Sequence, residues 1–147
     1  NDPDLVLLAE PTTGLDPQAR VLIWKQLLDL KKQGRALLLT THYMDEAQQL
    51  CDNIIVVDGG SVLDEGTPRE LIDRHVKSHV IEVKKPHVAK STDGKWEQED
   101  IGEAILYFVH NPEDLIADLP VDATYLQRHA NLEDVFLRIT GRTLRDN

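Results

Sequence analysis

The chain has 147 residues, 41% of them hydrophobic, which is enough for one or two small domains with an apolar core. Its 26 acidic side chains outnumber 16 basic ones, and the resulting net charge of −10 argues against a broad basic surface for nucleic acid. No apolar run approaches the roughly 18 residues that cross a bilayer, and the single cysteine, Cys51, excludes an internal disulfide. We therefore expect an acidic α/β protein that does not insert into a membrane directly and reaches one only through partner subunits.

The first predicted element is a short apolar strand, Leu5–Leu8, which lacks polar alternation and so has the pattern of a strand covered on both faces of a parallel sheet. Glu10 follows it, at the carboxyl end where open α/β sheets place their ligands. A helix is predicted next, with Asp16 as its cap, Pro17 in its first position and Gly34 as its stop. The pattern thus predicts a carboxylate at a sheet edge, between a strand and a helix.

The predicted helix has an apolar face spaced to pack on the sheet. Its members are Val21, Trp24, Leu27, Leu28 and Leu30. Trp24 has a ring that could stack on an adenine, but packing is the preferred interpretation of this position.

A second apolar strand, Ala36–Leu39, leads to His42 and then to a short predicted helix, 45–50. One strand–helix–strand unit separates Glu10 from His42. Because such crossovers are right-handed and their strands are parallel, both residues should emerge at the same edge of one sheet. The sequence therefore predicts that the carboxylate and the imidazole converge.

Two segments resemble motifs of the ATP-binding subunit of ABC transporters. Residues 8–17 read Leu-Ala-Glu-Pro-Thr-Thr-Gly-Leu-Asp-Pro, like the family's second acidic motif and the loop after it, and residues 40–47 read Thr-Thr-His-Tyr-Met-Asp-Glu-Ala, like its switch-histidine motif. The resemblance implies that Glu10 orients and deprotonates the attacking water. It also implies that His42 reaches the γ-phosphate and that Asp16 contacts a second copy of the subunit.

The chain departs from this family at Ala9, where members carry an Asp that holds Mg²⁺, usually through water. It also contains neither a Gly-x-x-x-x-Gly-Lys-Ser/Thr phosphate loop nor a Leu-Ser-Gly-Gly-Gln signature. We therefore expect ATP and Mg²⁺ to belong to an intact parent, with no metal ligand at position 9 and no cofactor for this chain alone. The chain is interpreted as a carboxyl-terminal fragment of a longer ATPase.

The segment up to residue 76 continues the same resemblance. An apolar strand, 54–57, is followed by an Asp58-Gly59-Gly60 turn and a second strand, 61–65, as in a hairpin with a two-residue turn. Thr67 and Pro68 then open a helix. Residues 1–76 are accordingly predicted to be the carboxyl-terminal half of a P-loop NTPase (RecA-like) parallel-sheet core.

Residues 77–147 are predicted to form a small α+β accessory or regulatory domain. The order strand, strand, helix, strand, helix favours helices on one face of a sheet. The predicted elements are strands 80–84, 104–109 and 123–126 and helices 111–119 and 131–142, with 85–100 as a loop or a long hairpin. His75 and His79 are four residues apart, but the strand that begins at Val80 and the lack of a third ligand argue against a metal site.

The final predicted helix is amphipathic and ends at Gly141. Its Asn-Leu-Glu-Asp-Val-Phe-Leu wording resembles the tail of the nodulation-factor and drug-export (ABC-2 type) branch, in which the ATPase pairs with a separate membrane permease. Leu132 and Phe136 could contact the ATPase core or its second copy, but packing within the chain is the preferred interpretation.

Two functional hypotheses follow. In the first, the chain is a fragment of the ATP-hydrolysing, energy-coupling subunit of an ABC exporter, cytoplasmic and peripheral on the inner face of the membrane, inactive alone. In the second, it comes from a non-hydrolytic regulatory or interaction protein whose Mg²⁺ site is lost at Ala9. ABC-type ATPases of DNA repair are a third class, disfavoured by the acidic charge and by the lack of a long heptad arm.

Overall fold

The computed structural model describes residues 4–141. Internal contacts divide the chain into two compact units, Asn1–Ile54 (unit 1) and Ile55–Asn147 (unit 2). This division falls within the third strand, whereas the functional division at residues 76 and 77 rests on the motifs and stays a prediction. Among the described residues, no helix combines the length and the apolar character that a membrane span requires.

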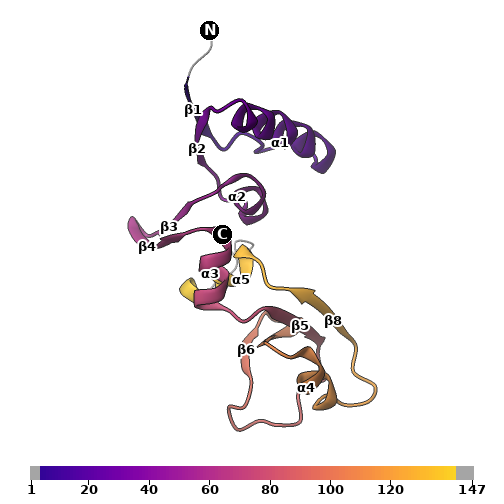
Figure 1. Ribbon diagram of the computed structural model, residues 1–147. Helices are drawn as coiled ribbons and strands as arrows, with labels where there is room; N and C mark the ends of the chain where they lie inside the picture. Colours follow the sequence, from indigo (N-terminus) through magenta and orange to yellow (C-terminus); the bar gives the residue numbers. More distant parts are fainter. Residues whose placement is uncertain (1–3, 142–147) are drawn as a thin grey trace. The chain divides into compact units, whose positions relative to one another are not determined.

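Unit 1 contains the predicted strand–helix–strand crossover (Figure 1). Its elements are β1 (Leu5–Ala9), α1 (Pro17–Lys32), β2 (Ala36–Thr40) and α2 (Met44–Leu50). The two strands pair in parallel, in a register that runs from Leu5 opposite Ala36 to Ala9 opposite Thr40. The capping prediction is confirmed, because an Asp16 side-chain oxygen accepts a hydrogen bond from the Ala19 amide at 2.8 Å.

The prediction that these strands are covered on both faces is wrong for this unit. Leu5, Leu7 and Leu38 keep 55%, 67% and 61% of their surface exposed, and residues alternate between exposed and half-buried along both strands. The reason is that α1 runs along one side of this two-stranded sheet only (Figure 1). The apolar stripe of α1 is correspondingly shallow: Leu27 is buried, whereas Val21 is exposed.

All of β3 (Ile54–Asp58) except its first residue lies in unit 2, where it pairs with β4 (Ser61–Gly66) in a two-stranded sheet that is followed by α3 (Pro68–His75). Gly59 and Gly60 both have positive φ, 58° and 77°. A type I′ turn requires this conformation at both central residues, so the predicted tight turn is confirmed. The predicted cap of α3 is confirmed as well, because the Thr67 hydroxyl oxygen accepts a hydrogen bond from the Glu70 amide.

A four-stranded antiparallel sheet in the order β6-β7-β5-β8 forms the rest of unit 2. Its elements are β5 (His79–Lys84), β6 (Glu97–Asp100), β7 (Ala104–Val109), α4 (Pro112–Ala117), β8 (Tyr125–His129) and α5 (Leu132–Thr140). Strand β6 lies within the stretch predicted as a loop or long hairpin, and β8 begins two residues later than predicted. The four residues of β6 are all polar, so they carry no apolar alternation, and the strand forms by pairing at the edge with β7.

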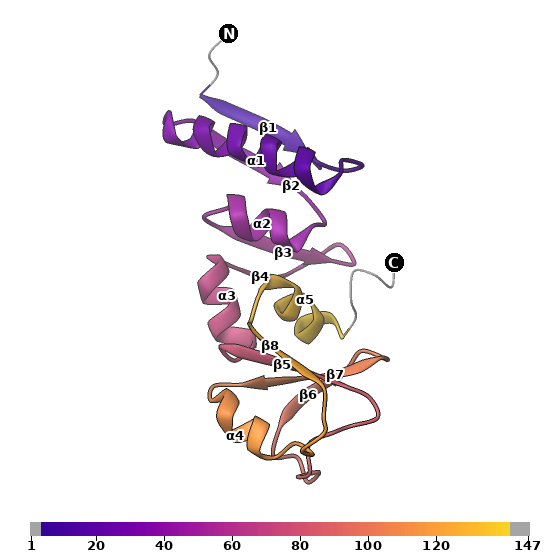
Figure 2. The same cartoon turned by 90° about the vertical axis from the view of Figure 1, so that its right-hand side faces the viewer.

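The two helices of this sheet cover opposite faces, so the prediction of helices on one face is wrong. Odd-numbered side chains of β5 and β7, such as Ile81 and Tyr107, form a core with Leu115 of α4. On the other face the Arg138 guanidinium of α5 lies 5.0 Å from the centre of the Phe108 ring. Figure 2 shows α4 and α5 on the two sides of the sheet. Because both faces are covered, all six residues of β7 are buried.

Helix α5 is fixed within unit 2. Asn131 and Asp134 form a capping box, and the buried Asp134 carboxylate accepts two hydrogen bonds from Arg128 of β8, at 2.7 and 2.8 Å. Leu132 and Phe136 are buried, and α5 packs against α3. The preferred interpretation, packing within the chain, is therefore confirmed.

The core between α4 and the sheet gives a first prediction. Leu115 is fully buried there, so Leu115→Ala should lower the free energy of unfolding of unit 2 by about 2–5 kcal/mol, because the substitution leaves a cavity. Leu126→Ala, at a leucine that is 59% exposed in the same sheet, should change it by less than about 1 kcal/mol. Urea denaturation can follow Trp96, which packs against this core, in a Trp24→Phe background. Equal losses for the two variants would contradict this packing.

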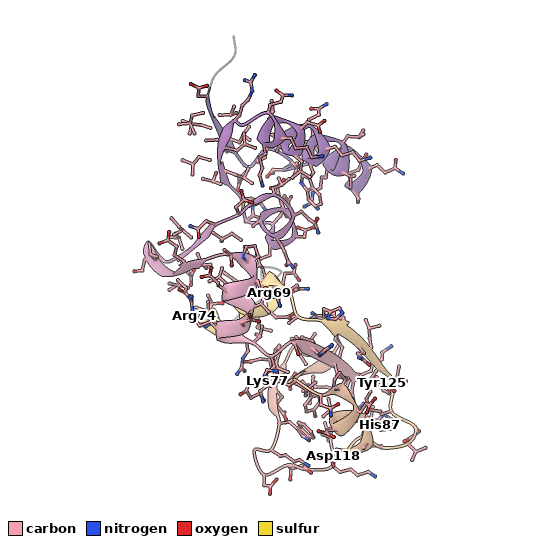
Figure 3. All side chains as sticks on the ribbon, in the orientation of Figure 1. Arg69, Arg74, Lys77, His87, Asp118 and Tyr125 are labelled. Carbon is pink, nitrogen blue, oxygen red and sulfur yellow. The ribbon has the colours of Figure 1, made fainter. Side chains whose placement is uncertain are left out.

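A carboxylate holds the loop between β5 and β6. Asp118 lies at the end of unit 2 that carries α4 (Figure 3), and its Oδ2 accepts hydrogen bonds from Trp96 Nε1 at 2.7 Å and from the Ser91 amide at 3.0 Å. The Trp96 indole and the Ser91 amide hold the pKa of the Asp118 carboxyl below its usual value. Folding therefore favours the ionised form.

The sign of this shift sets a pH dependence. A lowered folded-state pKa contributes stability that is present above the ordinary value of about 4 and is lost as the pH falls further. Asp118→Asn should therefore unfold at lower urea concentration than the wild type at pH 7, and the difference should shrink between about pH 5 and pH 3. Asp93→Asn, at an exposed loop carboxylate, is the control for the loss of one charge. A difference that stays constant with pH would refute this role.

Candidate functional site

The carboxyl ends of β1 and β2 bring the two predicted site residues together. Ala9 and Thr40 are paired at the end of the parallel register, and the Glu10 amide donates a hydrogen bond to the Thr40 carbonyl oxygen at 2.7 Å. His42 Nδ1 lies 2.8 Å from Glu10 Oε1, and the two side chains are 50% and 48% exposed. The predicted convergence of Glu10 and His42 is confirmed, and their chemical roles stay predictions.

The backbone of Glu10 is unusual. Its φ is 47°, and among residues 4–141 it is the one non-glycine residue with positive φ. This left-handed conformation costs a β-carbon-bearing residue of the order of 1–3 kcal/mol and persists where the surrounding structure holds it. The conformation turns the chain sharply out of β1 at the carboxylate. Sequence reasoning missed it, because Glu, unlike Gly or Asn, does not signal such a conformation.

The geometry of the pair suits proton transfer. When the His42 ring carries its hydrogen on Nδ1, it donates to the Glu10 carboxylate, and Nε2 is then the nitrogen available to another group. The carboxylate is half-exposed, so a water molecule can reach it. A carboxylate that water can reach and that an oriented imidazole holds is chemically suited to act as a general base, with the imidazole as its positioning partner.

Behind this pair lies a buried polar network that sequence reasoning also missed. The carboxylate of Glu46 in α2 is fully buried, and its Oε1 accepts hydrogen bonds from Thr12 Oγ1 at 2.5 Å and from Trp24 Nε1 at 3.0 Å. Trp24 thus contacts other residues of unit 1, in agreement with the packing interpretation. A glutamate in a short polar helix reads as a surface residue, so the sequence offers no signal for this network.

Arg20 of α1 contacts residues at the start of α2. Its guanidinium lies 4.3 Å from the centre of the Tyr43 ring and 5.1 Å from that of Trp24, and its Nη2 is 3.2 Å from Asp45 Oδ1. The Tyr43 ring in turn lies 4.3 Å from the His42 ring, centre to centre. The histidine is therefore connected to α1 through the Tyr43 ring and the Arg20 guanidinium.

Position 9 does not fit a metal site. Ala9 ends β1 without a side-chain oxygen, and within the described part of the chain no three His, Cys, Asp or Glu side chains are grouped so that they could hold a metal ion. Mg²⁺ is usually held by one or two carboxylates together with water and substrate phosphates, and position 9 contributes no carboxylate to such a set. Asp16 caps α1 and is exposed, and its predicted contact with a second subunit stays a prediction.

Comparison with known proteins supports the motif analysis. Residues 87–141 match the family model "Nodulation factor export protein NodI, C-terminal domain". Over 152 residues, 99% of the chain, it is 46% identical to the Nod factor export ATP-binding protein I of Cupriavidus metallidurans, and over 150 residues, 98% of the chain, it is 45% identical to that of Rhizobium etli. The chain is thus homologous to the carboxyl-terminal part of these ATP-binding subunits. The resemblance read from the motifs is confirmed.

The chain matches only part of the length of each relative. The chain spans about half the length of the curated relatives it matches, 50% for the protein of C. metallidurans and 48% for that of R. etli. Among solved structures, an ATP-binding subunit of an ABC transporter matches 50% of the chain with 30% of its own, at 30% identity and a TM-score of 0.45. The cbiO1 subunit of Clostridium perfringens matches 49% of the chain with 29% of its own, at 36% identity and the same TM-score.

Proposed function

We propose that the chain is the carboxyl-terminal part of the ATP-hydrolysing, energy-coupling subunit of an ABC exporter in the nodulation-factor and drug-export branch. Glu10 is the general base toward water, and His42 is the sensor of the γ-phosphate. The observation that carries the proposal is the 2.8 Å contact between His42 Nδ1 and Glu10 Oε1 at the ends of two parallel strands. The proposal is also supported by the relatives, because the chain is 46% identical to a protein whose name includes ATP binding and export.

We assign a different chemical role to each residue of the Glu10–His42 pair. Glu10 takes a proton from water, and the imidazolium form of His42 donates hydrogen bonds from Nδ1 to the carboxylate and from Nε2 to an oxygen of the terminal phosphoryl group. General-base catalysis of this kind contributes roughly 10²–10⁴-fold to a rate. The left-handed backbone at Glu10 fixes where the carboxylate leaves the strand, so the base is positioned before substrate arrives.

Other parts of the proposal concern groups outside these 147 residues. The phosphate loop and the signature motif do not occur in the sequence, so residues 1–76 act as a partial ATPase core that neither binds nor hydrolyses ATP alone. Residues 77–147 act as an accessory or regulatory domain. A second copy of the subunit, contacted through Asp16, and a membrane permease are the partners. The assembly then lies in the cytoplasm, against the inner face of the membrane.

Replacing the base tests the proposal. In a full-length subunit that contains this chain, Glu10→Gln should lower kcat for ATP hydrolysis by roughly 10²–10⁴-fold, because the amide still accepts a hydrogen bond from His42 but cannot take a proton. Glu133→Gln, at an exposed glutamate of α5, is the matched control and should keep the wild-type rate. Phosphate release under saturating ATP measures both. Turnover by Glu10→Gln at the wild-type rate would exclude Glu10 as the base.

Ala9 supports the alternative, a non-hydrolytic regulatory or interaction protein, because the residue offers no oxygen to a metal. Restoring the carboxylate separates the two functions. Ala9 is exposed at the end of β1, so Asp fits there without burial, and under the proposed function Ala9→Asp should raise the ATPase rate by about tenfold or more. Ala9→Asn, which matches Asp in shape without its charge, should give a much smaller gain. Equal, unchanged rates in all three proteins would favour the regulatory alternative.

A further inference from the structure

The buried Glu46 carboxylate calls for a physical explanation. Taking a carboxylate out of water is expensive unless it is paired, and the two side chains that donate hydrogen bonds to Glu46, Thr12 and Trp24, are neutral. Its second oxygen is buried and has no hydrogen-bond partner among the described residues. An apolar side chain of similar size would fill this space at lower cost. The arrangement therefore points to a role other than stability.

The position of the network in the chain indicates that role. Thr12 lies two residues after Glu10, and Glu46 lies four residues after His42, so the Thr12–Glu46 hydrogen bond joins the same two segments that carry the Glu10–His42 pair. Both Thr12 and Glu46 are fully buried, whereas the pair in front of them is half-exposed. Trp24 donates a second hydrogen bond to the same Glu46 oxygen and so connects α1 to the two segments.

The strained backbone at Glu10 must be held in place by the surrounding structure. This backbone is left-handed, and the turn that follows is fixed by hydrogen bonds from the Thr13 amide to the Glu10 carbonyl oxygen and from the Leu15 amide to that of Thr12. Thr12 is the residue of this turn that is bonded to α2. Without its hydroxyl, the turn would lose its connection to the helix that follows His42.

We propose, on the basis of the function proposed above, that Thr12 and Glu46 are positioning residues: their buried hydrogen bond holds the turn after β1 against α2 and so keeps the Glu10 carboxylate at hydrogen-bond distance from His42. Neither residue touches the reacting atoms. They act through the geometry of the pair, and a displacement of about 1 Å in such a site costs up to about a hundredfold in rate.

Kinetics of Thr12 variants in the full-length subunit test this role. Thr12→Val keeps the shape and removes the hydroxyl, so kcat for ATP should fall about tenfold while KM stays within twofold. Thr12→Ser keeps the hydroxyl and should restore most of the rate. In a His42→Ala background the pair no longer exists, and Thr12→Val should then lower the rate by less than twofold. A full tenfold loss in both backgrounds would show a merely structural effect and overturn the proposal.

Hydrogen exchange separates this inference from the proposed function. Peptides covering residues 10–16 should exchange faster in Thr12→Val than in the wild type or Thr12→Ser, while residues 104–117 of the other unit serve as the unchanged control. A subunit without ATPase activity but with this exchange pattern would refute the proposed function and leave the positioning intact. Unchanged exchange at 10–16 would refute the positioning whether or not ATP is hydrolysed. Thr12→Ala, which removes the same hydroxyl with a smaller side chain, replaces Thr12→Val if that variant does not fold.

Discussion

The parallel pairing of β1 with β2 is the constraint on which the candidate site depends. Its register places Ala9 opposite Thr40, so the residues that leave the two strands enter the same edge of the sheet. The hydrogen bond from the Glu10 amide to the Thr40 carbonyl oxygen extends this pairing by one step before the chain turns away. A shift of the register by one residue would move Glu10 along the strand and break its contact with His42.

The two units bury their strands to different extents, and the difference bears on function. In unit 2 helices cover both faces of the four-stranded sheet, and β7 is buried throughout. In unit 1 one face of β1 and β2 is open, with Leu5, Leu7 and Leu38 exposed side by side in the paired register. A contiguous apolar row of this kind is typical of a surface that another layer covers. This exposure supports the proposal that residues 1–76 are one part of a larger ATPase core.

Local signals were enough to predict most elements and the central contact of the site. Apolar runs, an Asp-Pro helix start and a Gly stop predicted β1, α1 and β2, and the handedness of the crossover then predicted that Glu10 and His42 meet. What the sequence could not show depends on tertiary contacts. Strand β6 has no apolar residue and exists through its pairing with β7, and the opposite placement of α4 and α5 is set by which face of the sheet each helix packs on.

The features that sequence reasoning missed in unit 1 share one property, which is that each is unfavourable by itself. A left-handed glutamate and a buried carboxylate with one unpartnered oxygen both lower stability, by about 1–3 kcal/mol for the backbone alone. Local propensity predicts neither, because propensity describes what is favourable in isolation. The left-handed residue is Glu10 itself, the buried carboxylate lies four residues after His42, and the hydrogen bond from Thr12, two residues after Glu10, joins the two segments. Strain concentrated at one edge of a sheet, around a carboxylate and an imidazole in contact, is the physical pattern that the proposed catalytic role of this edge leads us to expect, even though Ala9 offers no side-chain metal ligand there.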